Sequence, residues 1–128
     1  MRARKRYLTL PLLVLGVIVQ PGCRPSAQQS DPDRARATLR QALDAWQKGE
    51  TPDAFRERTS VTAVEPKWQA GVRLVGHEML GEGEMSGFDW QCKVRLSLEN
   101  AGGKKSQEKA TYSISTSPTL VIVRSEGS

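Results

Sequence analysis

The stretch Phe88–Leu98, FDWQCKVRLSL, decides the fold, because apolar and polar residues alternate over its whole length. Successive side chains of a β-strand point to opposite faces, so the alternation predicts a strand with one apolar and one polar face. The apolar positions are Phe88, Trp90, Cys92, Val94, Leu96 and Leu98, and the polar positions are Asp89, Gln91, Lys93, Arg95 and Ser97. A single apolar face indicates a sheet that is covered on one side only, which favours antiparallel strands.

Three more strands are predicted around this one. Asn100–Gly103 has the composition of a hairpin turn that follows the central strand. Gly81 and Gly83, in an otherwise extended stretch, predict a bulge or a sharp bend. The other strands are expected at Val72–Leu80, Gln107–Ser117 and Leu120–Arg124. Together the four strands would form an antiparallel meander.

Two helices are predicted ahead of the strands. Asp31 can cap a long N-terminal helix with Pro32 at its first position, and a short helix is expected from Thr51 to about Arg58. The apolar stripe of the long helix comprises Ala35, Leu39, Ala42, Leu43 and Trp46. A helix stripe and a one-sided sheet can bury each other, which predicts a single two-layer α+β domain over residues 31–126, with both helices on one face of the sheet.

The first 22 residues have the layout of an export signal. The run Leu8–Val19, LTLPLLVLGVIV, carries no charge and follows four basic residues. A basic start and about a dozen apolar residues are typical of a secretory signal, whereas a membrane-spanning helix needs roughly 20. We therefore expect residues 1–22 to be a leader that is removed on export.

The charge distribution argues against nucleic acid as a partner. The chain has 19 Lys and Arg residues, 14 Asp and Glu residues and a net charge of +5. Four of the basic residues lie in the leader and all acidic residues follow it, so the 106 residues from Cys23 onward carry a net charge of +1. The dense basic face of a nucleic-acid-binding domain is not present in that composition.

Cys23, close behind the apolar run, has two interpretations. Ordinary signal peptidase requires small residues three positions and one position before the cut, and cuts near here would place Gln20 or Pro25 at the outer position. The first interpretation is therefore a different kind of processing, with Cys23 as the mature N-terminus. The second is a disulfide between Cys23 and Cys92, the only other cysteine.

Gly22-Cys23 after an apolar run resembles a bacterial lipobox, in which Leu and small residues precede a cysteine that becomes residue one. Gln20 and Pro21 depart from that pattern. The resemblance implies a diacylglyceryl group on the Cys23 sulfur, which would anchor the chain to a membrane of the bacterial envelope with the domain facing the periplasm or the exterior. Residues 23–30 are polar and would form a tether that buries nothing.

The helix ending ALDAWQKGE, Ala42–Glu50, followed by a short helix and a meander, is similar to the cystatin-like and nuclear transport factor 2-like group of folds. In that group a curved antiparallel sheet wraps a long N-terminal helix. The layout also resembles that of many small uncharacterised bacterial lipoproteins. Enzymes of the wider group, such as polyketide-cyclase-like proteins, use His, Asp or Tyr side chains that point into the space between helix and sheet.

The chain offers few residues for such chemistry. His77 and Glu78 are adjacent on a strand and would point to opposite faces, and Asp89 would point to solvent. Cys92 lies among apolar positions of the strand and is expected to be a buried, unreactive thiol. A nucleophilic Cys92 would need a nearby base, and the chain has a single histidine, His77. No metal-ligand spacing or phosphate-binding glycine motif is present, so no metal or other cofactor is expected.

The candidate ligand or partner contacts are Trp68, His77 and Tyr112. Trp68 has a second interpretation as a core residue beneath the loop before the first long strand. The leading hypothesis is a non-catalytic, lipid-anchored envelope protein that binds a protein partner or a small ligand. The alternative is a polyketide-cyclase-like enzyme or carrier in which His77 and Tyr112 line a pocket between helix and sheet. A cystatin-like inhibitor rests on fold analogy alone, because the loop signature Gln-x-Val-x-Gly is absent.

Overall fold

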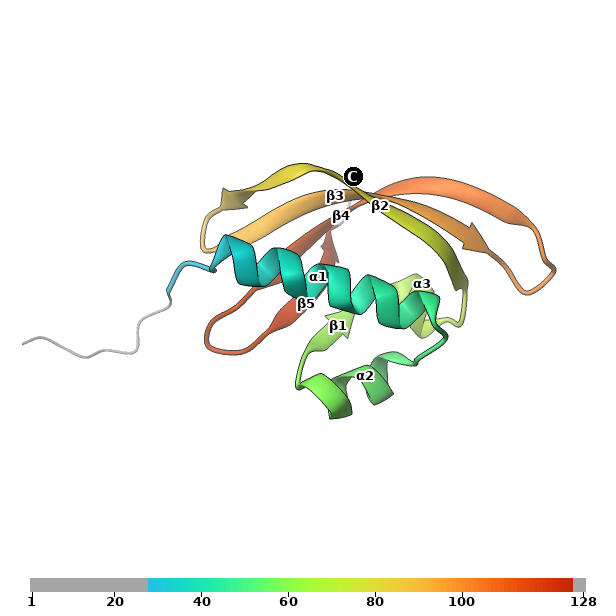
Figure 1. Cartoon of the computed structure of the whole chain (residues 1–128), viewed down its shortest axis with the longest axis horizontal. Coiled ribbons are helices and arrows are strands. Elements are labelled where there is room, and N and C mark those ends of the chain that lie inside the picture. The colour runs from blue at the N-terminus through green and yellow to red at the C-terminus, as the bar shows by residue number, and fades with distance from the viewer. Residues whose placement is uncertain (1–27, 126–128) are drawn as a thin grey trace, which may run out of the picture.

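The computed structural model describes residues 28–125 and consists of a twisted sheet with helices on one face (Figure 1). The helices are α1 (Pro32–Gln47), α2 (Pro52–Thr59) and α3 (Pro66–Gln69). The strands are β1 (Thr62–Val64), β2 (Arg73–Ser86), β3 (Asp89–Glu99), β4 (Lys105–Ser115) and β5 (Val121–Ser125). The strand order in the sheet is β1-β5-β4-β3-β2, and α1 lies along the inner face of the sheet near β2.

The expected α+β class is confirmed, but the four-stranded antiparallel meander is wrong. The sheet has five strands and is mixed, because β1 pairs parallel with β5 in the register Thr62 to Val121. β1 contains only three residues, too few for an alternation to stand out from the surrounding loop. The chain between α2 and β2 therefore supplies an edge strand and a one-turn helix where the sequence indicated only a loop.

Both main helices begin with the caps expected from the sequence. The Asp31 carboxylate accepts a hydrogen bond from the Asp33 N–H at 3.1 Å, and the Thr51 hydroxyl accepts one from the Ala54 N–H at 3.1 Å. These bonds satisfy N–H groups that have no partner within a helix. α2 ends at Ser60, whose positive φ of 66° turns the chain away.

The core lies between α1 and the inner face of the sheet. β3 contributes five alternate buried residues, and α1 contributes the whole of its predicted stripe. The buried residues of β3 are Trp90, Cys92, Val94, Leu96 and Leu98. Phe88 was expected on this face, but it is 57 % exposed. The reason is the two-residue loop Gly87–Phe88, in which the φ of +65° at Gly87 fits a type II′ hairpin turn and places Phe88 at its tip.

β2 is longer and more irregular than the expected Val72–Leu80. It continues to Ser86 and shifts register against β3 twice, between Leu74 and Gly76 and between Leu80 and Glu84. The second shift confirms the predicted bulge, and Gly83 there has a φ of +78°. A Cβ atom on Gly83 would overlap the Trp90 ring, so glycine is needed where the bulge crosses the core.

α1 also closes part of the free edge of the sheet. Three of its side chains donate hydrogen bonds to main-chain carbonyls in and just before β2. These bonds run from Trp46 to Val72 (2.8 Å), from Gln47 to Val75 (3.3 Å) and from Arg36 to Glu82. Two of the acceptors lie at the register shifts, where the ladder to β3 is interrupted. Edge carbonyls that are occupied in this way are less open to pairing with another strand.

The chain joins the domain at Ser30. Ser30 is 4 % exposed, its N–H donates to the Phe88 carbonyl at 2.8 Å, and its hydroxyl accepts from the Thr116 N–H at 3.0 Å. The tether predicted over residues 23–30 was expected to bury nothing, so its last residue belongs to the domain instead. The predicted leader and Cys23 lie outside the described residues.

Candidate functional site

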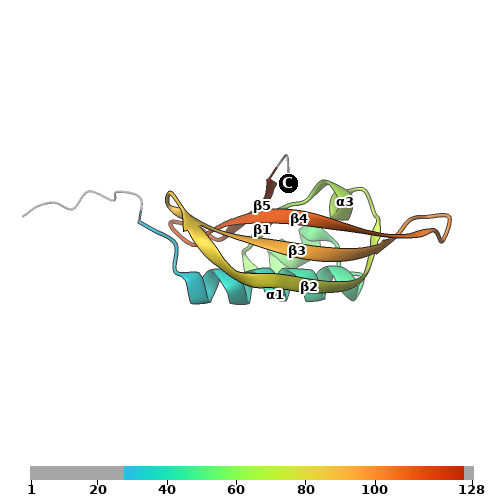
Figure 2. The same ribbon diagram turned by 90° about the horizontal axis from the view of Figure 1, so that it is seen from above.

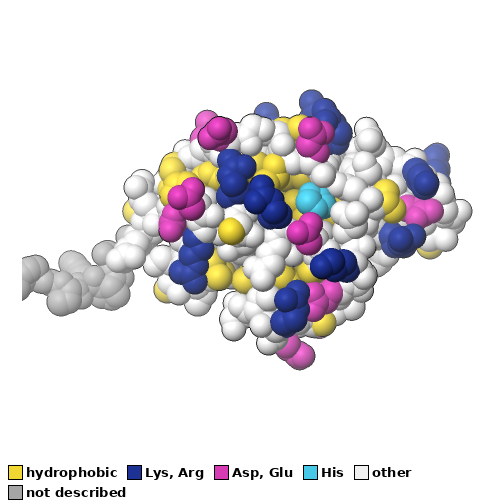
Figure 3. All heavy atoms as spheres, in the orientation of Figure 1, with side chains coloured by type: hydrophobic (Ala, Val, Ile, Leu, Met, Phe, Trp, Pro, Cys, Tyr) yellow, Lys and Arg dark blue, Asp and Glu magenta, His cyan; other side chains and the backbone are white. Residues whose placement is uncertain are grey.

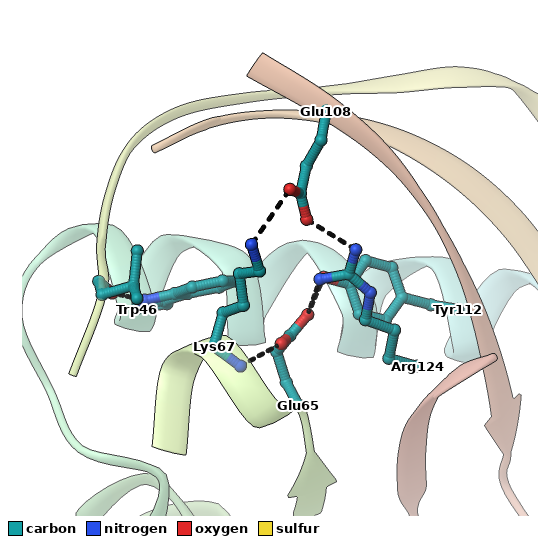
Figure 4. Close-up of polar contacts among 7 residues, drawn as sticks. Trp46, Glu65, Lys67, Glu108, Tyr112 and Arg124 are labelled. Carbon is teal, nitrogen blue, oxygen red and sulfur yellow. Dashed lines mark hydrogen bonds and ion pairs between the residues drawn. The ribbon is translucent and has the colours of Figure 1, made fainter. Parts of the chain in front are cut away.

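A polar network lies between α3 and the inner face of the sheet (Figure 4). Glu65, which is 2 % exposed, is its centre. One carboxylate oxygen, Oε1, accepts hydrogen bonds from the Tyr112 hydroxyl at 2.5 Å and from Arg124 at 3.3 Å. The other, Oε2, accepts from the Lys67 N–H at 2.6 Å and so caps α3. Both oxygens of this buried carboxylate are therefore occupied.

Glu108 extends the network and balances its charge. Its two oxygens pair with Arg124 at 2.5 Å and with the Lys67 ammonium at 3.1 Å. Burial by itself raises the pKa of Glu108, but the hydrogen bonds from Arg124 and Lys67 outweigh it and hold this pKa below its usual value. Burial, reinforced by the Glu65 carboxylate, raises the pKa of Tyr112 far above its usual range.

This network holds elements together and offers no free base. It joins β1, α3, β4 and β5 through two carboxylates and two cations, and buried charges persist only where they are paired in this way. Tyr112 was among the residues predicted from the sequence, whereas Glu65, Lys67, Glu108 and Arg124 were not. Glu108 could have been found from the sequence, because it lies two residues before Ala110 and four before Tyr112, on the face of β4 that points to the core.

The space between α1 and the sheet is filled. Trp46, Trp90 and Leu96 are all buried, and Trp46 stacks on Trp68 with ring centroids 5.7 Å apart. The cavity that remains beside Tyr112 measures about 10 Å³, which is roughly the space that one water molecule requires. The pocket that a polyketide-cyclase-like enzyme would need is not present there.

The three candidate contact residues do not form one site. Trp68 is 6 % exposed and donates its indole N–H to the Glu50 carbonyl at 2.7 Å, so it is a core residue. His77 lies on β2 and pairs with Asp44 of α1 at 3.0 Å. Tyr112 lies on β4, with β3 between it and the histidine strand. The helix side around this histidine carries cations and carboxylates interspersed (Figure 3).

The remaining candidates are placed as follows. Glu78 points to the face opposite to His77 and pairs with Arg95 at 2.6 Å, as the strand parity requires. Asp89 accepts a hydrogen bond from the Ser113 hydroxyl at 3.2 Å. Cys92 is a buried free thiol whose pKa is raised by burial. Among residues 28–125, no three His, Cys, Asp or Glu side chains are grouped in a way that could hold a metal ion.

The outer face of the sheet, opposite to α1, carries a cluster of three cations: Lys93, Arg95 and Lys109. No described element covers this face (Figure 2). Arg95 and Lys109 are direct cross-strand partners, and Lys93 follows on the same face of β3. Glu78 pairs with Arg95, but no carboxylate of the described residues forms an ion pair with Lys93 or Lys109.

A shallow hollow adjoins this cationic cluster. The bulge of β2 opens it on the outer face, and its volume is about 270 Å³. Leu80–Glu84 forms one wall, and Gln91 and Lys93 form part of the floor. Glu82 and Glu84 of that wall line the hollow together with Lys93, so the hollow itself carries both signs of charge, and the excess of cations lies on the side of Lys93 and Lys109.

A comparison of the chain with protein-family models, with curated proteins and with solved structures finds no match.

Proposed function

We propose that this protein is a non-catalytic, lipid-anchored protein of a bacterial envelope. Its cationic outer sheet face would bind an acidic surface of a partner protein. The observation that carries the proposal is the cationic cluster. Like charges that lie directly opposite each other across two strands destabilise a sheet, and Arg95 and Lys109 are placed in that way. An acidic partner surface would relieve their repulsion, and complementary charge also speeds association.

Three observations support a binding role rather than catalysis. The interior cavity of about 10 Å³ is too small for a substrate. His77 and Tyr112, the residues on which an enzymatic interpretation depends, lie on strands separated by β3. The Glu65 carboxylate accepts three hydrogen bonds from within the domain and is 2 % exposed, so it is engaged in holding the fold and lies out of reach of a substrate.

The anchor is proposed at Cys23, on the basis of the leader and the lipobox resemblance. The burial of the Cys92 thiol supports this anchor, because a disulfide with Cys23 would require the N-terminal segment to reach a buried position on β3. None of the described helices is long and apolar enough to cross a bilayer.

We also propose that the domain is a variant of the cystatin-like arrangement. The packing of α1 on the antiparallel strands β2, β3 and β4 supports this assignment, and the short parallel strand β1 would be an addition at the edge.

The partner site is tested by site-specific photo-cross-linking in bacterial cells that express the full chain. The photo-reactive residue replaces Gln107, an exposed residue next to Lys109 on the outer face of β4. A double charge reversal, Lys93→Glu with Lys109→Glu, is expected to reduce the cross-linked adduct about tenfold, since two exposed charge pairs worth about 0.7 kcal/mol each together amount to about 1.4 kcal/mol.

The matched control is Lys48→Glu with Arg56→Glu, which changes the net charge equally on the helix side of the molecule. This control should leave the adduct unchanged. An adduct that persists in the cluster variant, or that falls equally in both variants, contradicts the proposed site.

A further inference from the structure

Phe88 is the most exposed large apolar side chain of residues 28–125, at 57 %. The other two, Val64 and Val123, are cross-strand partners on β1 and β5 and cover part of each other. Phe88 instead projects alone from the tip of the β2–β3 loop, where the positive φ of Gly87 makes the turn. Exposure of an aromatic ring at this position contributes nothing to the core, which begins at Trp90.

The tip that carries Phe88 lies beside the point where the chain joins the domain. The Ser30 N–H donates to the carbonyl of Phe88 itself at 2.8 Å, and the Gln29 amide donates to the Gly87 carbonyl at 3.5 Å. Figure 1 shows the N-terminal segment and the β2–β3 loop at one end of the molecule and the β3–β4 hairpin at the opposite end. Any anchor close to the N-terminus therefore acts on the end that displays Phe88.

The length of the intervening chain sets how near that end is to an anchor. Cys23 precedes Ser30 by seven residues. A fully extended chain spans at most about 3.6 Å per residue, so Cys23 and Ser30 are separated by no more than about 25 Å. The 11 residues of β3 place the far hairpin another 36 Å or so beyond Phe88, at about 3.3 Å per residue.

We propose that Phe88 inserts into the interfacial layer of the membrane that holds the lipid on Cys23, and so orients the domain. This inference rests on the lipid anchor of the proposed function. Aromatic rings favour the boundary between headgroups and acyl chains, and a second contact beside a lipid anchor restricts how the attached domain can turn. The outer sheet face would then stand roughly perpendicular to the bilayer, open to a partner.

The charges at this end indicate which lipids matter. Asp31 and Asp33 at the start of α1 and Asp89 beside Phe88 are opposed by Arg34 and Arg36, so this end has no excess of positive charge. We therefore expect contact through the ring rather than through anionic headgroups, with the same strength on neutral and on acidic membranes.

The experiment uses the full chain, extracted from membranes and reconstituted into phosphatidylcholine vesicles whose acyl chains carry bromine, a quencher of indole fluorescence at short range. Phe88→Trp places a reporter at the loop tip, and Ala101→Trp places one in the β3–β4 turn as a matched control. The three native tryptophans are buried and provide a constant background. Flotation of the vesicles reports separately whether the protein is anchored.

For protein that floats, the fluorescence added by Phe88→Trp should shift to the blue and be quenched by the brominated lipid, whereas that added by Ala101→Trp should be unaffected. Replacement of part of the phosphatidylcholine by phosphatidylglycerol should leave the quenching unchanged. Floating protein with no quenching at the loop tip, or with equal quenching at both sites, overturns the inference and leaves the anchor intact. Protein that does not float overturns the proposed anchor, and the inference falls with it.

Discussion

At the scale of single residues, Glu65 and Glu108 are the least expected features of the molecule. A carboxylate that is 2 % exposed is stable only because Tyr112, Arg124 and the α3 N-terminus satisfy its oxygens. The same arginine reaches on to Glu108, so loss of one member leaves another charge without its partner. These contacts explain how a three-residue strand, β1, is held to the sheet.

The lowered pKa of Glu108 predicts how stability depends on pH. The folded state binds this proton more weakly than the unfolded state, so the stabilisation is present above the ordinary pKa of about 4.3 and is lost as the pH falls through the folded-state pKa. Glu108→Gln should cost about 1 kcal/mol at pH 7 and flatten the fall in urea midpoint below about pH 4.

Glu57→Gln provides the control for this experiment, because Glu57 is exposed on α2 and forms no ion pair with another described residue. Its stability profile should run parallel to that of the wild type. If the profile of Glu108→Gln also runs parallel to the wild type between pH 5 and pH 2, the network does not contribute as described.

At the scale of elements, β2 is the strand that combines an edge, two register shifts and the outer hollow. The glycines of its second shift both have positive φ, but only Gly83 faces the Trp90 ring, whereas Gly81 faces open space. The bulge therefore places two different demands on its glycines. Gly81 is needed for its backbone conformation, and Gly83 is needed both for its conformation and because a side chain there would overlap Trp90.

Alanine substitutions separate these two requirements. Gly81→Ala should cost about 1 kcal/mol, the strain of a positive φ, whereas Gly83→Ala adds overpacking against Trp90 and should cost about 3 kcal/mol or more. Urea unfolding of the two variants measures both values. Equal losses would mean that the bulge moves away from Trp90 without cost, contrary to the geometry given above.

The elements differ in how far they were predictable from sequence. β3 was recognised because five alternate positions face the core, and α1 because its stripe and its Asp31-Pro32 start agree. β1 and α3 are three and four residues long, so neither shows a period. Phe88 was misassigned because it lies in the two-residue turn just before β3. Its apolar side chain continues the alternation of β3 by one position, although the strand itself begins at Asp89.

At the scale of the whole molecule, the site was predictable only in part. Strand parity placed Lys93 and Arg95 on the polar face, but the opposition of Arg95 and Lys109 depends on the β3–β4 register, which the sequence does not define. Likewise, the proximity of Ser30 to Phe88 depends on a contact between residues 58 positions apart. The cationic cluster and the position of Phe88 beside Ser30 both result from the pairing of the strands, not from any sequence motif.

Residues 28–125 form a domain with a filled core and an uncovered charged sheet face. Its proposed role depends first on the anchor, because without it neither the orientation by Phe88 nor an envelope partner has a basis. The most direct measurement is the intact mass of the full protein after extraction from membranes. The account predicts a chain that begins at Cys23 and carries added diacylglyceryl mass, and an unmodified chain that begins at Gln28 or at Met1 would contradict it.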